Sequence, residues 1–319
     1  MARINIESML DPQMKAAMKK QAELTETPEG GNPEPDPQEM RRQYRIERSY
    51  WNADAPAVAS ITEHDVDTKN GAVPIRIYHP EPGTPLPVLV YSHGGGFVVG
   101  DNDTHDKIMR LLSLRSHMAV VGVAYHLSPE SKFPVAIEDI EAVIMYLLEK
   151  RHSFSVDTGH LGLGGDSAGA YLSMGVYLKL RAIYPGLVKH LQLIYGSYGL
   201  KDSITRRLYG GPEDGCGPAD LAYYNRCFFG SKENMRHPLA DPLNSDLNGF
   251  PPTFILAAEL DPLHDDSIVL YRLMKDAGVD AELKIYKGVL HGFIHLSRMV
   301  DKAEQALSDC ASYMRKWMS

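Results

Sequence analysis

Seven short apolar runs, most of them rich in β-branched residues, constrain the fold of this 319-residue chain more than any other feature. From the second run onward, segments long enough to form a helix separate them. This alternation predicts an α/β fold with a mostly parallel central sheet flanked by helices on both faces. Ligands of such sheets bind beyond the carboxyl ends of the strands. The predicted strands are residues 73–78, 87–92, 119–125, 161–164, 191–195, 253–258 and 282–286.

The chain ahead of the first predicted strand favours helices. Residues 1–28 predict a helix with Met, Ala and Leu on one side, and the Gly- and Pro-rich residues 30–37 interrupt it. A second helix is predicted over residues 38–51. Its four arginines are expected to form a solvated helix face, and they are Arg41, Arg42, Arg45 and Arg48.

Composition is that of one large soluble domain with a full core, because 44% of the residues are apolar and 23% are charged. The net charge of −8 argues against general affinity for nucleic acid or anionic membranes. No apolar run approaches the roughly 18 residues of a membrane span.

The first residues lack the apolar core of a signal peptide, and Cys216, Cys227 and Cys310 have no metal-ligand spacing. We expect a cytoplasmic protein whose cysteines serve in packing.

A candidate nucleophile follows the fourth predicted strand. Residues 165–169 read Gly-Asp-Ser-Ala-Gly and lead into a helix-like segment. In a strand–turn–helix setting, small flanking residues let the chain turn sharply and expose the hydroxyl of Ser167 at a helix N-terminus. The five-residue pattern alone is weak, but its setting favours a catalytic serine over an ordinary turn.

A serine nucleophile needs a base, and the base needs a carboxylate that orients it. Asp261 follows the sixth predicted strand and His291 follows the seventh, in the order acid and then histidine after the serine. Asp265 and Asp266 are competing acids, but capping or pairing within the next helix is the expected role for them. His295 lies one turn beyond His291 and is expected to be packed or solvent-facing.

A glycine run follows the second predicted strand, where residues 93–97 read His-Gly-Gly-Gly-Phe. Something must approach this backbone closely, either a bound phosphate or a transient oxyanion. The run lacks the Lys-Ser/Thr ending of a phosphate loop and opens no Gly-x-Gly-x-x-Gly helix. A His-Gly-Gly-Gly loop that donates amides beside a nucleophilic serine is known from lipases and esterases, which favours the oxyanion.

Taken together, these motifs resemble the hormone-sensitive-lipase-like branch of the α/β-hydrolases, and within it the bacterial acetyl esterases. The sequence departs from the pattern at His126, where arginine is commoner in the family. The ordered set runs from about residue 88 to 295. It comprises residues 93–97, 125–130, 133–134, 165–169, 261–263, 265–267 and 291–293, with 103–106 and 205–208 as further points of likeness to acetyl esterases.

The resemblance implies a cap formed by residues 1–55, a catalytic domain over residues 56–319, and a contribution to the cap from about 198–245. It also implies oxyanion donors at the amides of Gly95, Gly96 and Ala168. His93, Gly94 and Asp166 are expected to support the site without touching substrate. For Glu130 two roles stay open, since it either buttresses the serine turn and the glycine loop or caps the entry of the next helix.

The predicted function is a serine carboxylesterase that hydrolyses short-chain acyl esters, acetyl to butyryl, through an acyl-enzyme and without a metal or organic cofactor. Phe97, Tyr195, Tyr198 and Trp51 either line the pocket or serve in packing. The expected partner is a small-molecule ester, with no nucleic acid and no membrane, and the protein is expected to be a monomer or a small homo-oligomer. A regulatory protein contact leaves no mark in the sequence. The alternatives are a hydrolase-fold binding or regulatory protein without turnover, and an amidase on the same fold.

Overall fold

The computed structural model describes residues 4–25, 36–211 and 215–318. Within them, eight strands form one sheet in the order β1-β2-β4-β3-β5-β6-β7-β8. β1 and β2, and β2 and β4, pair antiparallel, whereas every other pair is parallel. The strands are β1 (Ser60–Thr68), β2 (Gly71–His79), β3 (Leu86–Ser92), β4 (Ala119–Val123), β5 (Val156–Asp166), β6 (Val188–Ile194), β7 (Thr253–Ala258) and β8 (Ala281–Tyr286).

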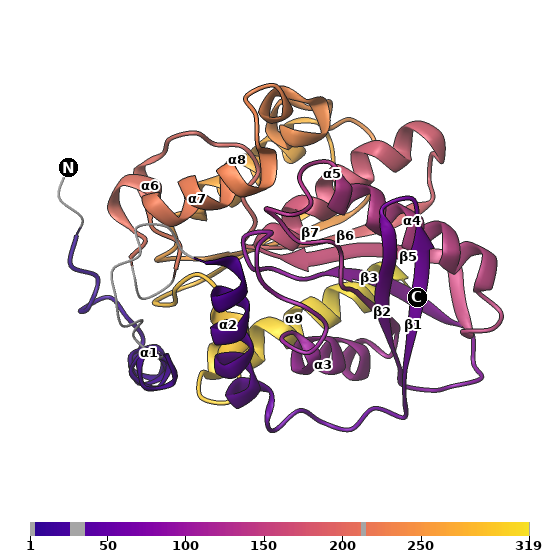
Figure 1. Cartoon of the computed structure of the whole chain (residues 1–319), viewed down its shortest axis with the longest axis horizontal. Helices are drawn as coiled ribbons and strands as arrows, with labels where there is room; N and C mark the ends of the chain where they lie inside the picture. The colour runs from indigo at the N-terminus through magenta and orange to yellow at the C-terminus, as the bar shows by residue number, and fades with distance from the viewer. Residues whose placement is uncertain (1–3, 26–35, 212–214, 319) are drawn as a thin grey trace.

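Helices cover both faces of the sheet, as predicted, with α3 and α9 on one side and α4, α5 and α8 on the other (Figure 1). β3 shows why, because Val88 and Val90 pack toward one helical layer and Leu89 and Tyr91 toward the other. The helices are α1 (Pro12–Leu24), α2 (Pro37–Asn52), α3 (Asp106–Ser116), α4 (Val135–Lys150), α5 (Ala168–Ile183), α6 (Ile204–Leu208), α7 (Pro218–Phe229), α8 (His264–Asp276) and α9 (Asp301–Met318), with short 3-10 turns η1 (Asn234–Arg236), η2 (Pro238–Ala240), η3 (Pro242–Asn244) and η4 (Phe293–Leu296).

Two sequence predictions about the first part of the chain are corrected. The prediction missed β1, whose sequence SITEHDVDT buries only Val66 because the strand lies at the sheet edge. The first helix starts at Pro12 rather than at the N-terminus, because the Asp11 side chain accepts the amide of Gln13 and Pro12 takes the first helical turn. Predicted residues 1–3, 26–28 and 30–35 lie outside the described residues.

α1, α2, α6 and α7, which we call the cap, line one cavity together with the loops that follow β3, β5 and β8. The N-terminal helices therefore join part of the 198–245 segment around that cavity. Whether residues 1–55 and 56–319 are separate domains stays a prediction. None of the described helices combines the length and the apolarity that crossing a membrane requires.

Candidate active site

Ser167 occupies a sharp turn between β5 and α5, with φ 53° and ψ −117°. A serine rarely adopts this positive φ, and such backbone strain persists where the surrounding structure enforces it. The neighbours explain the glycines on either side. A Cβ atom on Gly165 would lie 2.2 Å from the Ser92 carbonyl oxygen, and one on Gly169 would lie 1.8 Å from it. The turn therefore packs directly on the end of β3, and only glycine fits at both positions.

Asp261 and His291 converge on this serine from the ends of β7 and β8. His291 Nε2 lies 2.8 Å from Ser167 Oγ, and His291 Nδ1 lies 2.7 Å from Asp261 Oδ2. Asp261 is fully buried, and its other oxygen accepts the amide of Leu263 at 2.7 Å. Because an ionised carboxylate only accepts, Nδ1 carries the proton in the neutral ring and Nε2 is free to accept the serine hydroxyl.

The glycine loop follows β3 and faces the same cavity as Ser167 and Ala168. Gly95 has φ 114°, and a Cβ atom there would lie 2.2 Å from the Val99 carbonyl oxygen. Gly96 has φ 59°, and its Cβ would lie 2.5 Å from the Tyr224 ring in α7. Both positions therefore require glycine, and their backbone lies open to the cavity without side chains.

Asp166 links the serine turn to the glycine loop. Its Oδ1 accepts the Gly94 amide at 3.0 Å and the Tyr91 hydroxyl at 2.8 Å. A Cβ atom on Gly94 would lie 2.4 Å from Asp166 Oδ2, so the amide approaches this closely only because the residue is glycine. Burial opposes ionisation of Asp166, but the adjacent His105 ring holds the pKa of its carboxyl well below the usual range.

His93 supports the same loop from behind. Its Nδ1 lies 2.8 Å from the Gly94 carbonyl oxygen, and its ring stacks on Tyr125 with centroids 4.3 Å apart. The Tyr125 hydroxyl donates to the His93 carbonyl at 2.8 Å. Burial lowers the pKa of His93 to about 4, so the neutral ring carries the Nδ1 proton toward Gly94.

Glu130 has neither of the contacts expected for it. Its half-exposed carboxylate forms a bidentate pair with Arg41 of α2, at 2.8 and 2.7 Å. The capping role is wrong because α4 begins only at Val135 and the residue at its N-cap position is Pro134. The link to the glycine loop is indirect, because Arg41 Nε donates to the Val98 carbonyl oxygen at 2.8 Å.

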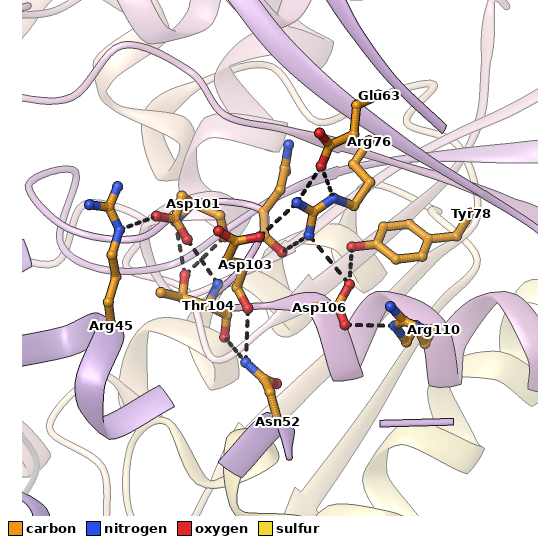
Figure 2. Close-up of polar contacts among 11 residues, drawn as sticks. Arg45, Asn52, Glu63, Arg76, Tyr78, Asp101, Asp103, Thr104, Asp106 and Arg110 are labelled. Carbon is orange, nitrogen blue, oxygen red and sulfur yellow. Dashed lines mark hydrogen bonds and ion pairs between the residues drawn. The ribbon is translucent and has the colours of Figure 1, made fainter. Parts of the chain in front are cut away.

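The turn of residues 101–104 gives α2 two further attachments (Figure 2). Arg45 of α2 pairs with Asp101 at 2.6 Å. The Asn52 side-chain amide, at the end of the same helix, donates to the carbonyl oxygens of Asp103 and Thr104 at 2.9 and 3.1 Å. Thr104 in turn donates its amide to the Asp101 carboxylate at 2.8 Å.

Arg76 of β2 fastens this turn to the sheet. It pairs with Glu63 on β1, with Asp103 at 2.6 Å and with Asp106 at 3.4 Å (Figure 2). Asp106, at the start of α3, also accepts the Tyr78 hydroxyl at 2.8 Å and pairs with Arg110 at 2.6 Å. This network therefore joins α2, the first two strands and α3.

The expectation that the α2 arginines form a solvated face is wrong for two of them. Arg48 is 8% exposed, pairs with Glu47 at 3.0 Å and lies over the Tyr44 ring at 4.5 Å from its centroid. The side chain of Arg41 is held between Glu130 and the body of the protein. The sequence does carry a signal for the burial of Arg48. Met40, Tyr44 and Arg48 are spaced four residues apart, and residues four apart share a helix face.

The competing acids do not join the triad, but they bind groups outside α8 rather than within that helix as expected. Asp266 is fully buried, and its Oδ1 accepts the amide of Tyr198 at 2.8 Å. Its Oδ2 pairs with Arg206 of α6 at 2.8 Å. Asp265 accepts the amide of Thr205 at 3.0 Å. His295 is a packed residue, 5% exposed and edge-on to another histidine ring.

A cavity of about 640 Å³ lies over Ser167. Of the predicted pocket aromatics, Phe97 and Tyr195 line it, whereas Trp51 and Tyr198 are buried in packing. The body contributes Gly95, Gly96, Phe97, Ser167, Ala168, Tyr171, Tyr195 and His291, and the cap contributes Met14, Gln21, Met40, Gln43, Tyr44, Glu47, Arg48, Arg206, Leu221, Tyr224 and Asn225, with Cys216 between α6 and α7.

Comparison with known proteins places this geometry in a family. The model of the alpha/beta hydrolase fold matches residues 89–295, which is more than half of the chain. The chain belongs to the α/β-hydrolase family. Its structural relatives are esterases of the hormone-sensitive-lipase-like branch, as the sequence motifs predicted.

Three solved structures illustrate the likeness. A hyperthermophilic esterase from the archaeon Pyrobaculum calidifontis is 32% identical with a TM-score of 0.89, and the match covers 97% of this chain and 98% of that one. A thermophilic and thermostable carboxylesterase cloned from a metagenomic library is 31% identical over 91% and 100% of the chains, with a TM-score of 0.87. A fungal esterase from Rhizomucor miehei is 28% identical over 97% and 98%, also with a TM-score of 0.87.

Proposed function

We propose that this α/β-hydrolase is a serine carboxylesterase that cleaves short-chain acyl esters, acetyl to butyryl, through an acyl-enzyme. One observation carries the proposal. In this cavity, Ser167 Oγ lies 2.8 Å from His291 Nε2 and His291 Nδ1 lies 2.7 Å from Asp261, so one chain of hydrogen bonds joins the three side chains. Esterase activity in the related structures supports the same reaction class.

In the first half-reaction, Ser167 Oγ attacks the ester carbonyl carbon while His291 Nε2 takes the hydroxyl proton. The buried Asp261 stabilises the imidazolium that forms and keeps its Nδ1 proton in place. His291 then gives its Nε2 proton to the alkoxide, the alcohol leaves, and the acyl group remains on Ser167.

In the second half-reaction, His291 deprotonates a water molecule that attacks the acyl carbon. The carboxylic acid is released, and the proton returns to Ser167 Oγ. In both tetrahedral intermediates we assign stabilisation of the oxyanion to the amides of Gly95, Gly96 and Ala168. Support comes from the open glycine backbone and from the position of Ala168 at the first turn of α5, where amides lack helical partners.

The preference for short acyl groups rests on how the cavity aromatics are packed. Phe97 meets Tyr171 edge-on at 5.5 Å between centroids and stacks on Phe228 at 3.9 Å. Phe229, a further lining residue, lies 4.9 Å from Phe228. We place the acyl group beside these rings, where a chain longer than butyryl would have to displace them, and we therefore assign acetyl to butyryl esters as the substrates.

A cytoplasmic location is part of the proposal. The three cysteines of the sequence are Cys216, Cys227 and Cys310, and all are buried and outside any disulfide. Such cysteine use suits a reducing compartment. Fractionation of the producing cell with an antibody against the chain tests this, and recovery with extracytoplasmic markers would contradict it.

The function is tested by hydrolysis of p-nitrophenyl esters from acetate to palmitate, with Ser167→Ala as the matched control and circular dichroism as the check on folding. We expect a maximum between acetate and butyrate, with the variant at background. Folded wild-type protein as inactive as the variant would overturn the esterase and favour a binding or regulatory protein. Faster turnover of the corresponding p-nitroanilides would favour an amidase.

A further inference from the structure

A cysteine thiol lies beside two of the three proposed catalytic side chains. The Sγ of Cys216, a carboxylate oxygen of Asp261 and a ring nitrogen of His291 all lie within 4.8 Å of one another. Cys216 and His291 both line the cavity that holds Ser167, so a solute that reaches the serine also reaches the thiol. The cysteine comes from the loop between α6 and α7, far in sequence from both partners.

Backbone packing holds Cys216 in this position. Gly210, in the same loop, has φ 85°, and a Cβ atom there would lie 2.7 Å from the Cys216 carbonyl oxygen and 3.1 Å from the Pro262 ring. The loop therefore presses against the residue that directly follows Asp261. On the other side, Gly217 precedes α7 and donates its amide to Asp220 at 2.9 Å. Cys216 itself is 4% exposed, so the surrounding residues confine its thiol to a small volume beside Asp261 and His291.

A buried cysteine often serves only as a small apolar residue, but the neighbours here are themselves metal ligands. Thiolate, imidazole and carboxylate together form a donor set that suits Zn²⁺ and similar thiophilic cations. Their bonds of about 2.0–2.3 Å place tetrahedral donors roughly 3.3–3.8 Å apart, so binding requires side-chain shifts of about 1 Å. Water from the cavity can occupy the fourth position, as in open zinc sites.

A second group of potential metal ligands within the described residues differs from the group around Cys216. His105, Asp166 and His295 also approach within 4.8 Å, but all three are buried. Oδ1 of Asp166 already accepts both the Gly94 amide and the Tyr91 hydroxyl. This group supports the glycine loop and contains no thiol.

We propose that Cys216, Asp261 and His291 form a binding site for a thiophilic divalent cation, represented by Zn²⁺, and that the bound cation inhibits the enzyme by drawing His291 away from Ser167. On binding, the Cys216 thiol proton passes to solvent and the sulfur becomes a ligand. When His291 binds through Nδ1, the proton on that nitrogen also passes to solvent, and when it binds through Nε2 no further proton is lost. No oxidation state changes. Cation binding stands on the geometry alone, whereas the inhibition rests on the esterase proposed above.

Inhibition is measured with wild-type protein and p-nitrophenyl acetate over a range of Zn²⁺ concentrations, with Mg²⁺ as the hard-cation control and EDTA to reverse the effect. Each variant is compared with its own metal-free rate. Removing a direct ligand should cost at least the 10- to 100-fold typical of outer-sphere partners, so Cys216→Ser should raise the half-inhibitory Zn²⁺ concentration by about tenfold or more. Cys310→Ser removes a buried thiol of α9 and should leave the wild-type value unchanged.

Binding is measured without catalysis through the ultraviolet charge-transfer absorption that a thiolate gives with Cd²⁺, a thiophilic stand-in for Zn²⁺. Ser167→Ala should show this absorption, and Ser167→Ala combined with Cys216→Ser should not. This pattern supports the site even if no ester is turned over. Absence of the absorption in Ser167→Ala, or its persistence in the double variant, overturns the site. Equal Zn²⁺ sensitivity of Cys216→Ser and wild type overturns the inhibition.

Discussion

The carboxyl ends of β5, β7 and β8 and the cap face each other across the cavity, but different interactions hold them in place. Ser167, Asp261 and His291 follow strands that the register of the sheet fixes relative to one another. Every residue of β7 is buried, so the position of the acid is set by the core. The cap helix α2 is instead attached by side-chain pairs, such as Arg41 with Glu130 and Arg45 with Asp101.

The difference indicates a division of labour. Groups that must meet within hydrogen-bond distance stand on the rigid sheet, where burial and backbone pairing fix them. The residues of α2 that shape the far side of the cavity stand on a helix held by partly exposed ion pairs, which are worth little individually in free energy. Substitutions in the sheet-borne site should therefore reduce the rate of chemistry, and substitutions at the cap attachments should alter substrate binding.

The largest effect is expected from Asp261→Asn. An amide can donate a hydrogen bond to Nδ1, which favours the His291 tautomer that cannot accept the serine proton. We expect kcat to fall by about 10⁴-fold while the fold persists. Steady-state kinetics together with a thermal melt measure both quantities. A folded variant with more than a tenth of the wild-type kcat would remove Asp261 from the proposed triad.

A smaller loss is expected from Asp166→Asn, which tests a positioning residue. The neutral amide accepts the Gly94 amide more weakly, so the glycine loop should hold the oxyanion less well. We expect kcat to fall by about 10- to 100-fold with KM within about twofold, because the oxyanion forms only during reaction. A rise in KM at constant kcat would show that Asp166 shapes the pocket instead.

Acid should lower the free energy of unfolding through a histidine buried in the central sheet. Burial lowers the pKa of His190 in β6 to about 4, whereas in the unfolded chain it is about 6.5. Between these values only the unfolded state binds this proton, so the contribution is present above pH 6.5 and is lost as the pH falls toward 4. The free energy of unfolding should fall by about 1.4 kcal/mol per pH unit for this residue.

Urea titrations from pH 7 to 4 measure that slope. His190→Gln should reduce it. Equal slopes for wild type and His190→Gln would show that His190 takes up its proton in the folded protein.

The smallest effect is expected at the cap. Arg41→Ala removes the pair with Glu130 and the bond to the Val98 carbonyl, which loosens α2 over the cavity. We expect KM for bulky esters to change by about threefold and kcat for acetate to stay within about twofold. Arg42→Ala is the matched control, because Arg42 is half exposed and pairs with Glu39 of its own helix. If Arg41→Ala instead abolished turnover of acetate, the two regions would not be separable.

The sequence predicted the sheet-borne side of this comparison well because its signals are local. Short apolar runs predicted seven of the eight strands, and the residues after them included Ser167, Asp261 and His291, which the structure brings together. β1 escaped because a polar edge strand lacks an apolar run. The burial of Arg48 and the position of Cys216 escaped because each depends on contacts between distant segments, which no local pattern records.

The central claim is that the ester's acyl group passes through Ser167. Rapid mixing of wild-type protein with p-nitrophenyl acetate, followed by acid quenching and peptide mass spectrometry, tests it most directly. The account predicts a burst of p-nitrophenol and an acetyl group on the peptide that carries Ser167, both absent from Ser167→Ala. Turnover with the acetyl group on another residue, such as Cys216 or His291, or with the same burst in Ser167→Ala, would contradict it.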